Sequence, residues 1–362
     1  MTIPHSRPFI DKDDIMAVSA VLASGQIAQG KKLKEFEDAV AAFIGTKYAV
    51  AVSSGTAALY LALRALQIGY DHEIIVPSYV CSSPFWAIKL IGAQPKIVDI
   101  DLSDFNISAS EVKKNITPKT KAVIVPHMFG CPAEIDELID IGIPIIEDCA
   151  QALGAEFKNR KVGSFGTISV FSFYATKMIT TGEGGMILTN NQRLVERIKE
   201  IRDYDKRSLE ILRFNFKMTD LQAALGISQM KKLKNFIEKR RRTASLYSKN
   251  FKSSMLRLPV EAANRKSTYY RYVVLTKERK SLQEFARIRD ISCERPVWKP
   301  LHRYFKTTGY PNSDFAYKYA LSIPIYPRLT QMEKKYLIRE IALILRRLAR
   351  NDRFNLRNRY SV

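Results

Sequence analysis

A pair of carboxylates and a lysine follow apolar runs of the sequence, where catalytic groups often lie. Glu147 and Asp148 end the apolar run 143–146, and strand alternation points their side chains to opposite sides. A carboxylate at the end of a buried strand needs a cationic or hydrogen-bonding partner, so a salt bridge, a helix cap or a catalytic role each accounts for the pair. Lys177 follows a second apolar run, 168–174, and precedes a turn rich in Thr and Gly. A lysine so placed is either a Schiff-base former or an ordinary surface lysine.

A segment of small residues, Ser53-Ser54-Gly55-Thr56-Ala57, joins an apolar run to a helical pattern. Small side chains let a ligand approach the backbone closely, and free amides at a helix start favour a phosphate. The same composition is also common in simple helix caps. A phosphate-binding segment, a strand-end aspartate and a loop lysine are together what pyridoxal phosphate requires.

Alternating apolar runs and amphipathic segments supply the elements that position these residues. The pattern predicts strands at 48–52, 73–80, 95–100, 121–128, 143–148, 167–174 and 185–189. Between the first five of these it predicts helices at 56–66, 82–91, 109–115 and 133–141. Strands separated by helices indicate a largely parallel sheet covered on both faces, with functional groups at the strand ends. A charged helix from 192 to about 206 and a long basic helix at 220–250 follow.

The texture of the sequence changes after about residue 255. A strand is predicted at 269–275 and a terminal amphipathic helix at 331–349. The 362 residues suffice for about two domains. We therefore expect a large α/β domain of residues 1–250, which includes the N-terminal segment, and a small α+β domain of residues 251–362.

Basic side chains outnumber acidic ones, 58 to 36, and the excess lies in the second half of the chain. Residues 1–180 carry a net charge of −2, whereas residues 181–362 carry +24. Such a field attracts nucleic acid, an anionic membrane surface or a phosphorylated substrate, and does not choose among them. The run Lys239-Arg240-Arg241-Arg242 falls in a helical pattern without helix-turn-helix or zinc-finger spacing. We interpret it as a solvated helix face rather than a nucleic-acid patch.

The sequence carries no sign of a membrane or export signal. No stretch reaches the roughly 18 uncharged apolar residues of a membrane span, and the first residues lack the apolar core of a signal peptide. We therefore expect a cytoplasmic protein. The four cysteines are too scattered for a disulfide framework or a zinc site, so we expect four reduced thiols and no metal.

Four motifs, in order along the chain, are similar to those of one enzyme family. They are SSGTAALYLAL, EDCAQALGA, FSFYATKMITTGEGG and FNFKMTDLQAALG. From about residue 5 to residue 340 the chain resembles the pyridoxal-phosphate-dependent sugar aminotransferases called DegT/DnrJ/EryC1/StrS. The resemblance implies the aspartate-aminotransferase-like fold, fold type I: a large α/β domain with a mostly parallel central sheet flanked by helices, and a smaller C-terminal α+β domain.

The resemblance also implies roles for individual residues. Lys177 would form the Schiff base with pyridoxal 5′-phosphate and move the proton, and Asp148 would keep the pyridine nitrogen protonated. Gln151 would bond the ring oxygen of the cofactor. The residues implied as phosphate ligands are Gly55, Thr56, Ala57, Ser172 and, from a second subunit, Asn215. A residue supplied by the second subunit makes a homodimer the smallest active unit.

Two positions depart from the family pattern. Cys81 stands where relatives place an aromatic ring against the cofactor, so either Tyr79 or Trp86 stacks there or the thiol itself packs on that face. Tyr204 stands where many relatives have histidine and glycine, and it lies either near the substrate or at a charged helix end.

The retained Lys177, which dehydratases of the family replace with histidine, favours amino transfer. The resemblance implies L-glutamate as donor and a nucleoside-diphosphate-linked keto-sugar as acceptor, in surface-polysaccharide or amino-sugar biosynthesis. A cyclitol ketone is the alternative acceptor, and His302 is either a substrate contact or a surface or core histidine. A non-catalytic regulator or nucleic-acid binder is expected to lose Lys177 or Asp148. Since both are present, we expect small-molecule partners and no nucleic acid.

Overall fold

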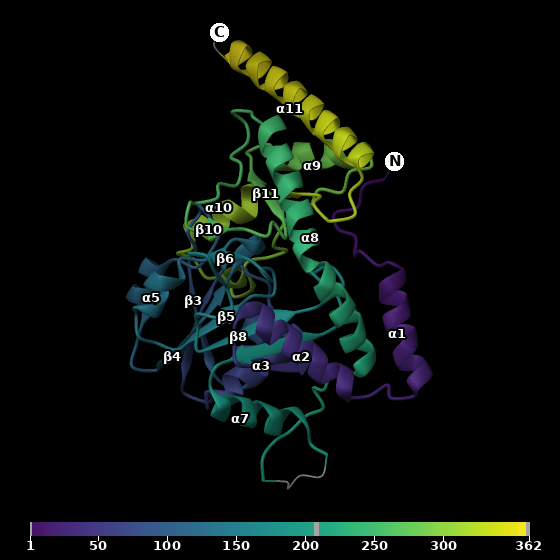
Figure 1. Cartoon of the computed structure of the whole chain (residues 1–362). Coiled ribbons are helices and arrows are strands. Elements are labelled where there is room, and N and C mark those ends of the chain that lie inside the picture. Colours follow the sequence, from purple (N-terminus) through teal and green to yellow (C-terminus); the bar gives the residue numbers. More distant parts are fainter. Residues whose placement is uncertain (1, 206–209, 360–362) are drawn as a thin grey trace.

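A seven-stranded sheet forms the centre of the structure, a computed structural model that describes residues 2–205 and 210–359, with side chains up to residue 349 (Figure 1). Across the sheet the strands are β1 (Tyr48–Val52), β9 (Gly185–Thr189), β8 (Ile168–Ser172), β5 (Ile145–Asp148), β4 (Thr120–Pro126), β2 (Glu73–Pro77) and β3 (Gln94–Val98). Only β9 runs antiparallel to its neighbours in this sheet. The predicted largely parallel α/β sheet is therefore confirmed.

Alternation along the strands gives the sheet two apolar faces. The helices on one face are α3 (Gly55–Ala65), α4 (Ser83–Leu90) and α7 (Gln192–Arg202). Those on the other are α2 (Lys31–Ile44), α5 (Ala109–Asn115), α6 (Ile135–Ile139) and the first half of α8 (Asp220–Asn250), against which α1 (Lys12–Ser24) packs. Ile146 belongs to the first core and Ile145 to the second. The same alternation directs the next two residues, Glu147 and Asp148, to opposite faces.

The C-terminal elements build a third core around a two-stranded sheet. Its strands are β11 (Tyr272–Leu275) and β12 (Ala320–Ile323), and its helices are α9 (Arg279–Ile288), α10 (Pro311–Tyr319) and α11 (Gln331–Arg359). Ile3 and Tyr247 also belong to this core, so residues on both sides of position 250 share it. The proposed division into residues 1–250 and 251–362 stays a prediction. Figure 1 shows α8 running from the central sheet to these elements.

Short elements complete the described chain. A three-stranded sheet in the order β10 (Arg265–Lys266), β6 (Glu156–Phe157), β7 (Arg160–Lys161) joins the two parts, and single 3₁₀ turns lie at Met128–Gly130 and Leu301–Tyr304. All four cysteines are free thiols, as predicted. Among the described residues, no helix has the length and apolar character needed to span a membrane.

The predicted boundaries hold for β1, β9, α5 and α8 and shift elsewhere. The predicted strand 269–275 begins only at Tyr272, because Tyr269 has a positive φ of 48°, which breaks an extended chain. The predicted helix from 192 to about 206 ends at Arg202, and residue 206 lies outside the described residues. The terminal helix α11 continues past residue 349, to Arg359.

The basic run of α8 is not a solvated face throughout. Arg240 is buried, and its Nη1 donates hydrogen bonds to three backbone carbonyls, those of Tyr269, Tyr270 and Ile325. The interpretation of this run as solvated is therefore wrong at Arg240, which instead ties α8 to the C-terminal elements. Burial is the main reason that the pKa of Arg240 falls to about 10.

Candidate active site

Asp148 lies at the carboxyl end of β5, beside the end of the parallel strand β8. The side chain is buried, and its Oδ1 accepts a hydrogen bond of 3.0 Å from the Ala150 N–H. Burial raises the pKa of Asp148 above its usual value, although the Ala150 amide and the positive charge of Lys177 act in the opposite direction. The carboxylate is therefore less stable than in water and would gain from a further cationic partner.

Lys177 lies in a loop that β8 and β9 hold at both ends. The Phe173 N–H donates to the Gly184 carbonyl, and the Lys177 N–H donates to the Tyr174 carbonyl, both at 2.9 Å. The Lys177 side chain is half-buried, and its Nζ lies 5.4 Å from the centroid of the Tyr270 ring. The structure therefore brings Lys177 and Asp148, 29 positions apart in the sequence, within electrostatic range of each other.

The start of α3 lies against the end of β8. In the ladder, Gly185 pairs with both Val52 of β1 and Ser172 of β8, so these two strand ends are drawn together. A Cβ on Gly55 would lie 2.9 Å from the Ser172 Cβ, and one on Gly185 would lie 2.3 Å from the Ser54 carbonyl oxygen. Glycine is thus required at both positions for this close approach.

The backbone amides at the start of α3 are not equally available. The Ser54 hydroxyl caps the helix by accepting from the Ala57 N–H at 3.1 Å, so that amide already has a partner. Thr56 is exposed, and its hydroxyl lies 2.7 Å from that of Ser83. An anion at this helix start would thus meet the Gly55 and Thr56 amides and the Ser172 hydroxyl before it competed for Ala57.

Gln151 and Asn215 are placed differently. The Gln151 Oε1 accepts from the Phe129 N–H at 3.0 Å, which fixes its orientation beside the strand ends of β4 and β5. Asn215 is exposed in the segment between α7 and α8, where its Oδ1 accepts from the Lys217 N–H. The carbonyl of the next residue, Phe216, accepts a hydrogen bond from the Ser53 N–H. Asn215 thus lies on the outside of the chain, near the start of α3.

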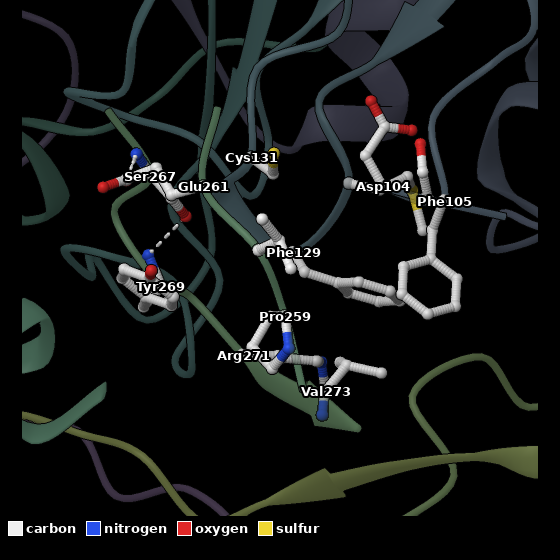
Figure 2. A pocket seen from close by; sticks show the side chains of 13 residues that line it. Asp104, Phe105, Phe129, Cys131, Pro259, Glu261, Ser267, Tyr269, Arg271 and Val273 are labelled. Atoms are coloured by element: carbon white, nitrogen blue, oxygen red, sulfur yellow. Dashed lines mark hydrogen bonds between the residues drawn. The ribbon is translucent and has the colours of Figure 1, made fainter. Parts of the chain in front are cut away.

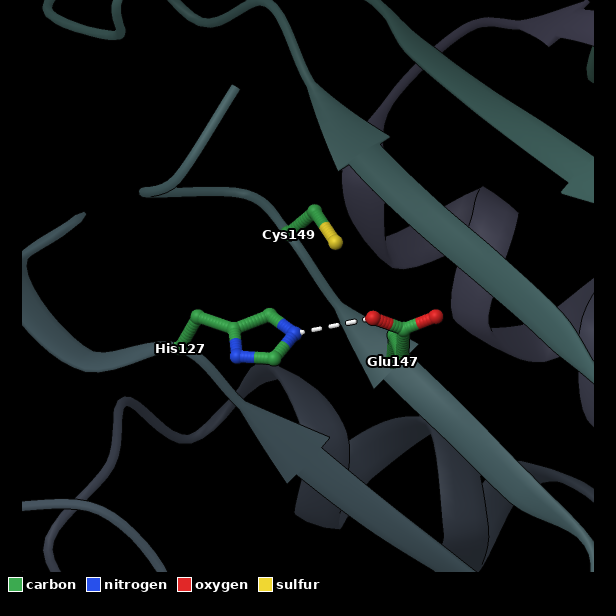
Figure 3. A group of neighbouring side chains, drawn as sticks. All are labelled: His127, Glu147 and Cys149. Atoms are coloured by element: carbon green, nitrogen blue, oxygen red, sulfur yellow. Dashed lines mark hydrogen bonds and ion pairs between the residues drawn. The ribbon is translucent and has the colours of Figure 1, made fainter. Parts of the chain in front are cut away.

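Glu147 points away from this site into a buried hydrogen-bond network (Figure 3). Its carboxylate accepts hydrogen bonds from three backbone amides, those of Gly163, Phe165 and Gly166. The Ala133 N–H donates to His127 Nδ1, so the proton of this imidazole sits on Nε2, which donates to Glu147 Oε2 at 3.1 Å. Burial alone would raise the pKa of Glu147, but these hydrogen bonds lower it below its usual value.

His127, Glu147 and Cys149 offer three ligand-type atoms within 4.8 Å of one another. Both carboxylate oxygens already accept N–H groups, and both imidazole nitrogens have partners. Burial raises the pKa of the Cys149 thiol well above its usual value, which keeps it protonated. The cluster is therefore a structural network that fixes the strand ends, and the sequence offered Glu147 but no sign of its partner His127.

Glu147→Gln is expected to destabilise the fold by about 2–4 kcal/mol, because an amide NH₂ would then face N–H donors. A folded-state pKa below the unfolded one stabilises the protein above the unfolded pKa, and this stabilisation is lost as the pH falls through the folded pKa. The difference between wild type and variant should therefore shrink in acid. Urea unfolding of the cofactor-free protein at pH 7 and pH 4 measures it. Equal stability at pH 7 would contradict the structural role of Glu147.

Among the three candidates for the ring-facing position, Cys81 is the one that lies within electrostatic range of Asp148 and Lys177, and its contact with the cofactor stays a prediction. Tyr79 is fully buried and packs on Phe105, and Trp86 points out from α4 with 61% of its surface exposed. Cys81 is exposed in the loop that follows β2, and the charges of Asp148 and Lys177 both affect the pKa of its thiol. Desolvation by neighbouring protein atoms, followed by the negative charge of Asp148, raises the pKa of this thiol, so it stays neutral.

The other candidate substrate residues lie elsewhere. His302 is buried, with Nδ1 2.6 Å from the Ser78 hydroxyl and Nε2 3.1 Å from Asp314, so the alternative of a core histidine is confirmed. Both ring nitrogens are engaged, which leaves none for a substrate. Tyr204 is exposed just beyond the end of α7, next to Asp203, whose carboxylate pairs with Lys217.

Tyr270, next to Lys177, was missed by the sequence analysis. The sequence places it in a run of tyrosines that reads as strand, and nothing in that run indicates contact with a residue nearly a hundred positions earlier.

A separate pocket, shown in Figure 2, adjoins this region between the strand-end loops and the C-terminal elements. Phe129, Tyr269 and Arg271 line it, whereas Lys177 and Asp148 do not.

Comparison with known proteins gives consistent matches. The family model described as the DegT/DnrJ/EryC1/StrS aminotransferase family matches residues 8–342. A GDP-perosamine synthase of Escherichia coli O157:H7 is 32% identical over 356 residues, 94% of this chain and 97% of that protein. The spore coat polysaccharide biosynthesis protein SpsC of Bacillus subtilis is 33% identical over 362 residues, 91% of this chain and 93% of that protein. The solved structure of Spr1654 from Streptococcus pneumoniae, in its PLP form, has a TM-score of 0.90 at 25% identity and covers 96% of this chain and 99% of its own.

Proposed function

Because the chain belongs to the DegT/DnrJ/EryC1/StrS aminotransferase family, we propose that it transfers the amino group of L-glutamate to a keto-sugar with pyridoxal 5′-phosphate as cofactor. The family relationship and the fold of pyridoxal-phosphate-dependent aminotransferases are the ones that the sequence motifs predicted. The observation that carries the proposal is that Lys177 and the buried Asp148 lie within electrostatic range of each other, next to the carboxyl ends of the neighbouring strands β8 and β5.

The start of α3 fits the phosphate of this cofactor. Gly55 and Gly185 leave room where any larger side chain would collide with Ser172 or with the Ser54 backbone. The helix start favours an anion, and the Ser172 hydroxyl adds a donor from the end of β8. We assign the phosphate to Gly55, Thr56 and Ser172, with Ala57 contributing through the helix start that its amide helps to form.

Asp148 fits the pyridine nitrogen. Its carboxylate is buried, its pKa is raised by that burial, and a protonated ring nitrogen would supply the missing cationic partner. Pyridoxal phosphate supplies an electron sink for the carbanion at the substrate carbon, and it does so well only with a protonated ring. Asp148 keeps that proton in place. Gln151, held by the Phe129 amide, is positioned to bond the ring oxygen through its free NH₂ group.

Lys177 supplies the amine that holds the cofactor covalently and that, once displaced by the amino donor, moves the proton. The loop bonds at Phe173 and Lys177 fix the backbone of this lysine, and its side chain is half-buried. Cys81 takes the position against the ring face that an aromatic residue takes in relatives. Its neutral thiol packs there without adding a charge beside Asp148.

Asn215 is assigned to the phosphate site of a second subunit. Its exposure on the outside of the chain, beside the Phe216 contact with Ser53, supports a role across a homodimer interface. Size-exclusion chromatography with light scattering tests the dimer directly. A mixed dimer of Asn215→Ala and Lys177→Ala subunits would show which subunit's site each residue serves.

A nucleoside-diphosphate-linked acceptor is favoured over a cyclitol ketone by two observations. The name of the Escherichia coli relative refers to a GDP-linked sugar. The net charge of +24 on residues 181–362 suits a doubly phosphorylated handle. Surface-polysaccharide biosynthesis is the setting that the name of the Bacillus subtilis relative supports.

Titration of the purified holoenzyme with L-glutamate tests the donor half of the proposal. The absorption band at about 400–430 nm of the lysine-bound cofactor should convert to the shorter-wavelength pyridoxamine form, with release of 2-oxoglutarate. Nucleoside-diphosphate keto-sugars and a cyclitol ketone, added separately, should then restore the band only with the true acceptor. If cofactor binds but L-glutamate leaves the spectrum unchanged, the donor assignment is wrong.

A further inference from the structure

Tyr270 forms a wall beside the Lys177 side chain. The residue is 8% exposed, and the centroid of its ring lies 5.4 Å from Lys177 Nζ. Its hydroxyl lies 3.4 Å from that of Thr176, the residue before the lysine. Tyr270 thus touches the lysine loop at two successive residues, once through the ring and once through the hydroxyl.

The surroundings of Tyr270 are strongly cationic. Lys177 approaches from the loop after β8, the Arg271 guanidinium lies 5.3 Å from the ring centroid, and Arg240 of α8 donates to the Tyr270 carbonyl. His5 of the N-terminal segment contacts Arg271 but is uncharged, because burial and Arg271 lower its pKa to about 3. Although burial alone would raise the pKa of the Tyr270 phenol, Lys177 and Arg271 lower it to about 8.

From this geometry we propose that Tyr270 is a positioning residue that holds the free Lys177 amine in its reactive place. The inference deepens the proposed function and rests on it. A lysine side chain has four rotatable bonds, and a displaced amine would otherwise sample many positions remote from the reacting carbon. The aromatic face attracts the protonated amine, and the hydroxyl bond to Thr176 keeps the ring in register with the loop.

Tyr270 also ties the lysine loop to the C-terminal elements. It lies two residues before β11, and its backbone carbonyl bonds to Arg240 of α8. Tyr270 therefore lies on the segment that leads into the smaller sheet, whereas Lys177 lies on a loop of the central sheet. The placement of these two parts relative to each other sets the space open to the amine.

Two substitutions and one control separate this role from a structural one. Tyr270→Phe removes the hydroxyl alone, and Tyr270→Leu removes the aromatic face. The control is Tyr269→Phe. The Tyr269 ring stacks on Tyr272, and the cation over its face is the Arg241 guanidinium, not Lys177. Borohydride reduction followed by peptide mapping reports cofactor attachment to Lys177, and circular dichroism reports folding, both without turnover.

For Tyr270→Leu we expect the maximal rate of the L-glutamate half-reaction to fall about 10- to 100-fold, with the KM for L-glutamate within about threefold of wild type. For Tyr270→Phe we expect the ultraviolet phenol titration of the cofactor-free protein, in which the Lys177 amine is free, to lose an ionisation near pH 8 that wild type and Tyr269→Phe retain. Cofactor attachment should be unchanged in all three variants.

A Tyr270→Leu variant with the rate and pH profile of wild type would overturn the positioning role. A change in KM alone would also overturn it, since that would indicate ground-state binding of the donor. Failure of the proposed function is recognised separately, because wild type itself would then leave L-glutamate unchanged or fail to attach the cofactor.

Discussion

Replacing Lys177 by alanine is expected to lower the transamination rate by at least about 10³-fold, because both covalent attachment of the cofactor and the proton transfer depend on this amine. The side chain is half-buried at the end of a loop held by backbone bonds, so its loss should leave the fold intact. The variant should lack the yellow band that borohydride bleaches. Stopped-flow absorbance with L-glutamate and acceptor measures the rate.

Lys177→Arg separates the effect of the positive charge at this position from the effect of the primary amine. A guanidinium keeps a positive charge near Asp148 but cannot serve as the attached amine, so this variant should be as inactive as the alanine variant. Lys252→Ala, at an exposed lysine outside the site, is the matched control and should keep wild-type activity and spectrum. Wild-type activity, or an undiminished yellow band, in Lys177→Arg would contradict the assignment.

Asp148→Asn is expected to lower the rate about 10²- to 10³-fold while the cofactor-free protein stays folded. The asparagine Oδ1 can still accept from the Ala150 N–H, but it no longer holds a proton on the ring nitrogen. The folded-state pKa of Asp148 is raised, and such a group stabilises the fold below its unfolded pKa and loses that contribution as the pH rises through the folded pKa. At pH 7 the cofactor-free variant should therefore be at least as stable as wild type.

The neighbouring carboxylate provides the contrast for this experiment. Glu147→Gln should lose stability, and Asp148→Asn should lose activity without losing stability. Urea unfolding of the two cofactor-free variants gives their stabilities, and the L-glutamate half-reaction of the cofactor-loaded variants gives their rates. If Asp148→Asn unfolded as readily as Glu147→Gln, Asp148 would be a structural carboxylate and its assigned role would be wrong.

The sequence predicted the central sheet well because its signals are local. Most strands of this sheet are short runs of apolar residues, and β1 and β9 match their predicted bounds to the residue. The opposite directions of Glu147 and Asp148 follow from strand alternation alone. The four motifs then led to the family: three of them lie where β1, β5 and β8 end, and the fourth lies where α8 begins.

The partners of these residues could not be predicted because they come from distant parts of the chain. His127 contacts Glu147 from the end of β4, the neighbouring strand in the sheet, and no residue near Glu147 in the sequence indicates this contact. Tyr270 reaches Lys177 from the segment before β11, where the left-handed Tyr269 delays the start of the predicted strand to Tyr272. Arg240 looked like one charge of a solvated run, although its position in α8 places it beneath that same segment.

Transfer of nitrogen itself is the most direct test of the account. The wild-type holoenzyme is incubated with ¹⁵N-labelled L-glutamate and a nucleoside-diphosphate keto-sugar, and the sugar product is analysed by mass spectrometry. We expect an amino sugar that carries the ¹⁵N label, formed in step with 2-oxoglutarate and absent with Lys177→Ala. An unlabelled product, or conversion of the sugar by the Lys177→Ala variant, would contradict it.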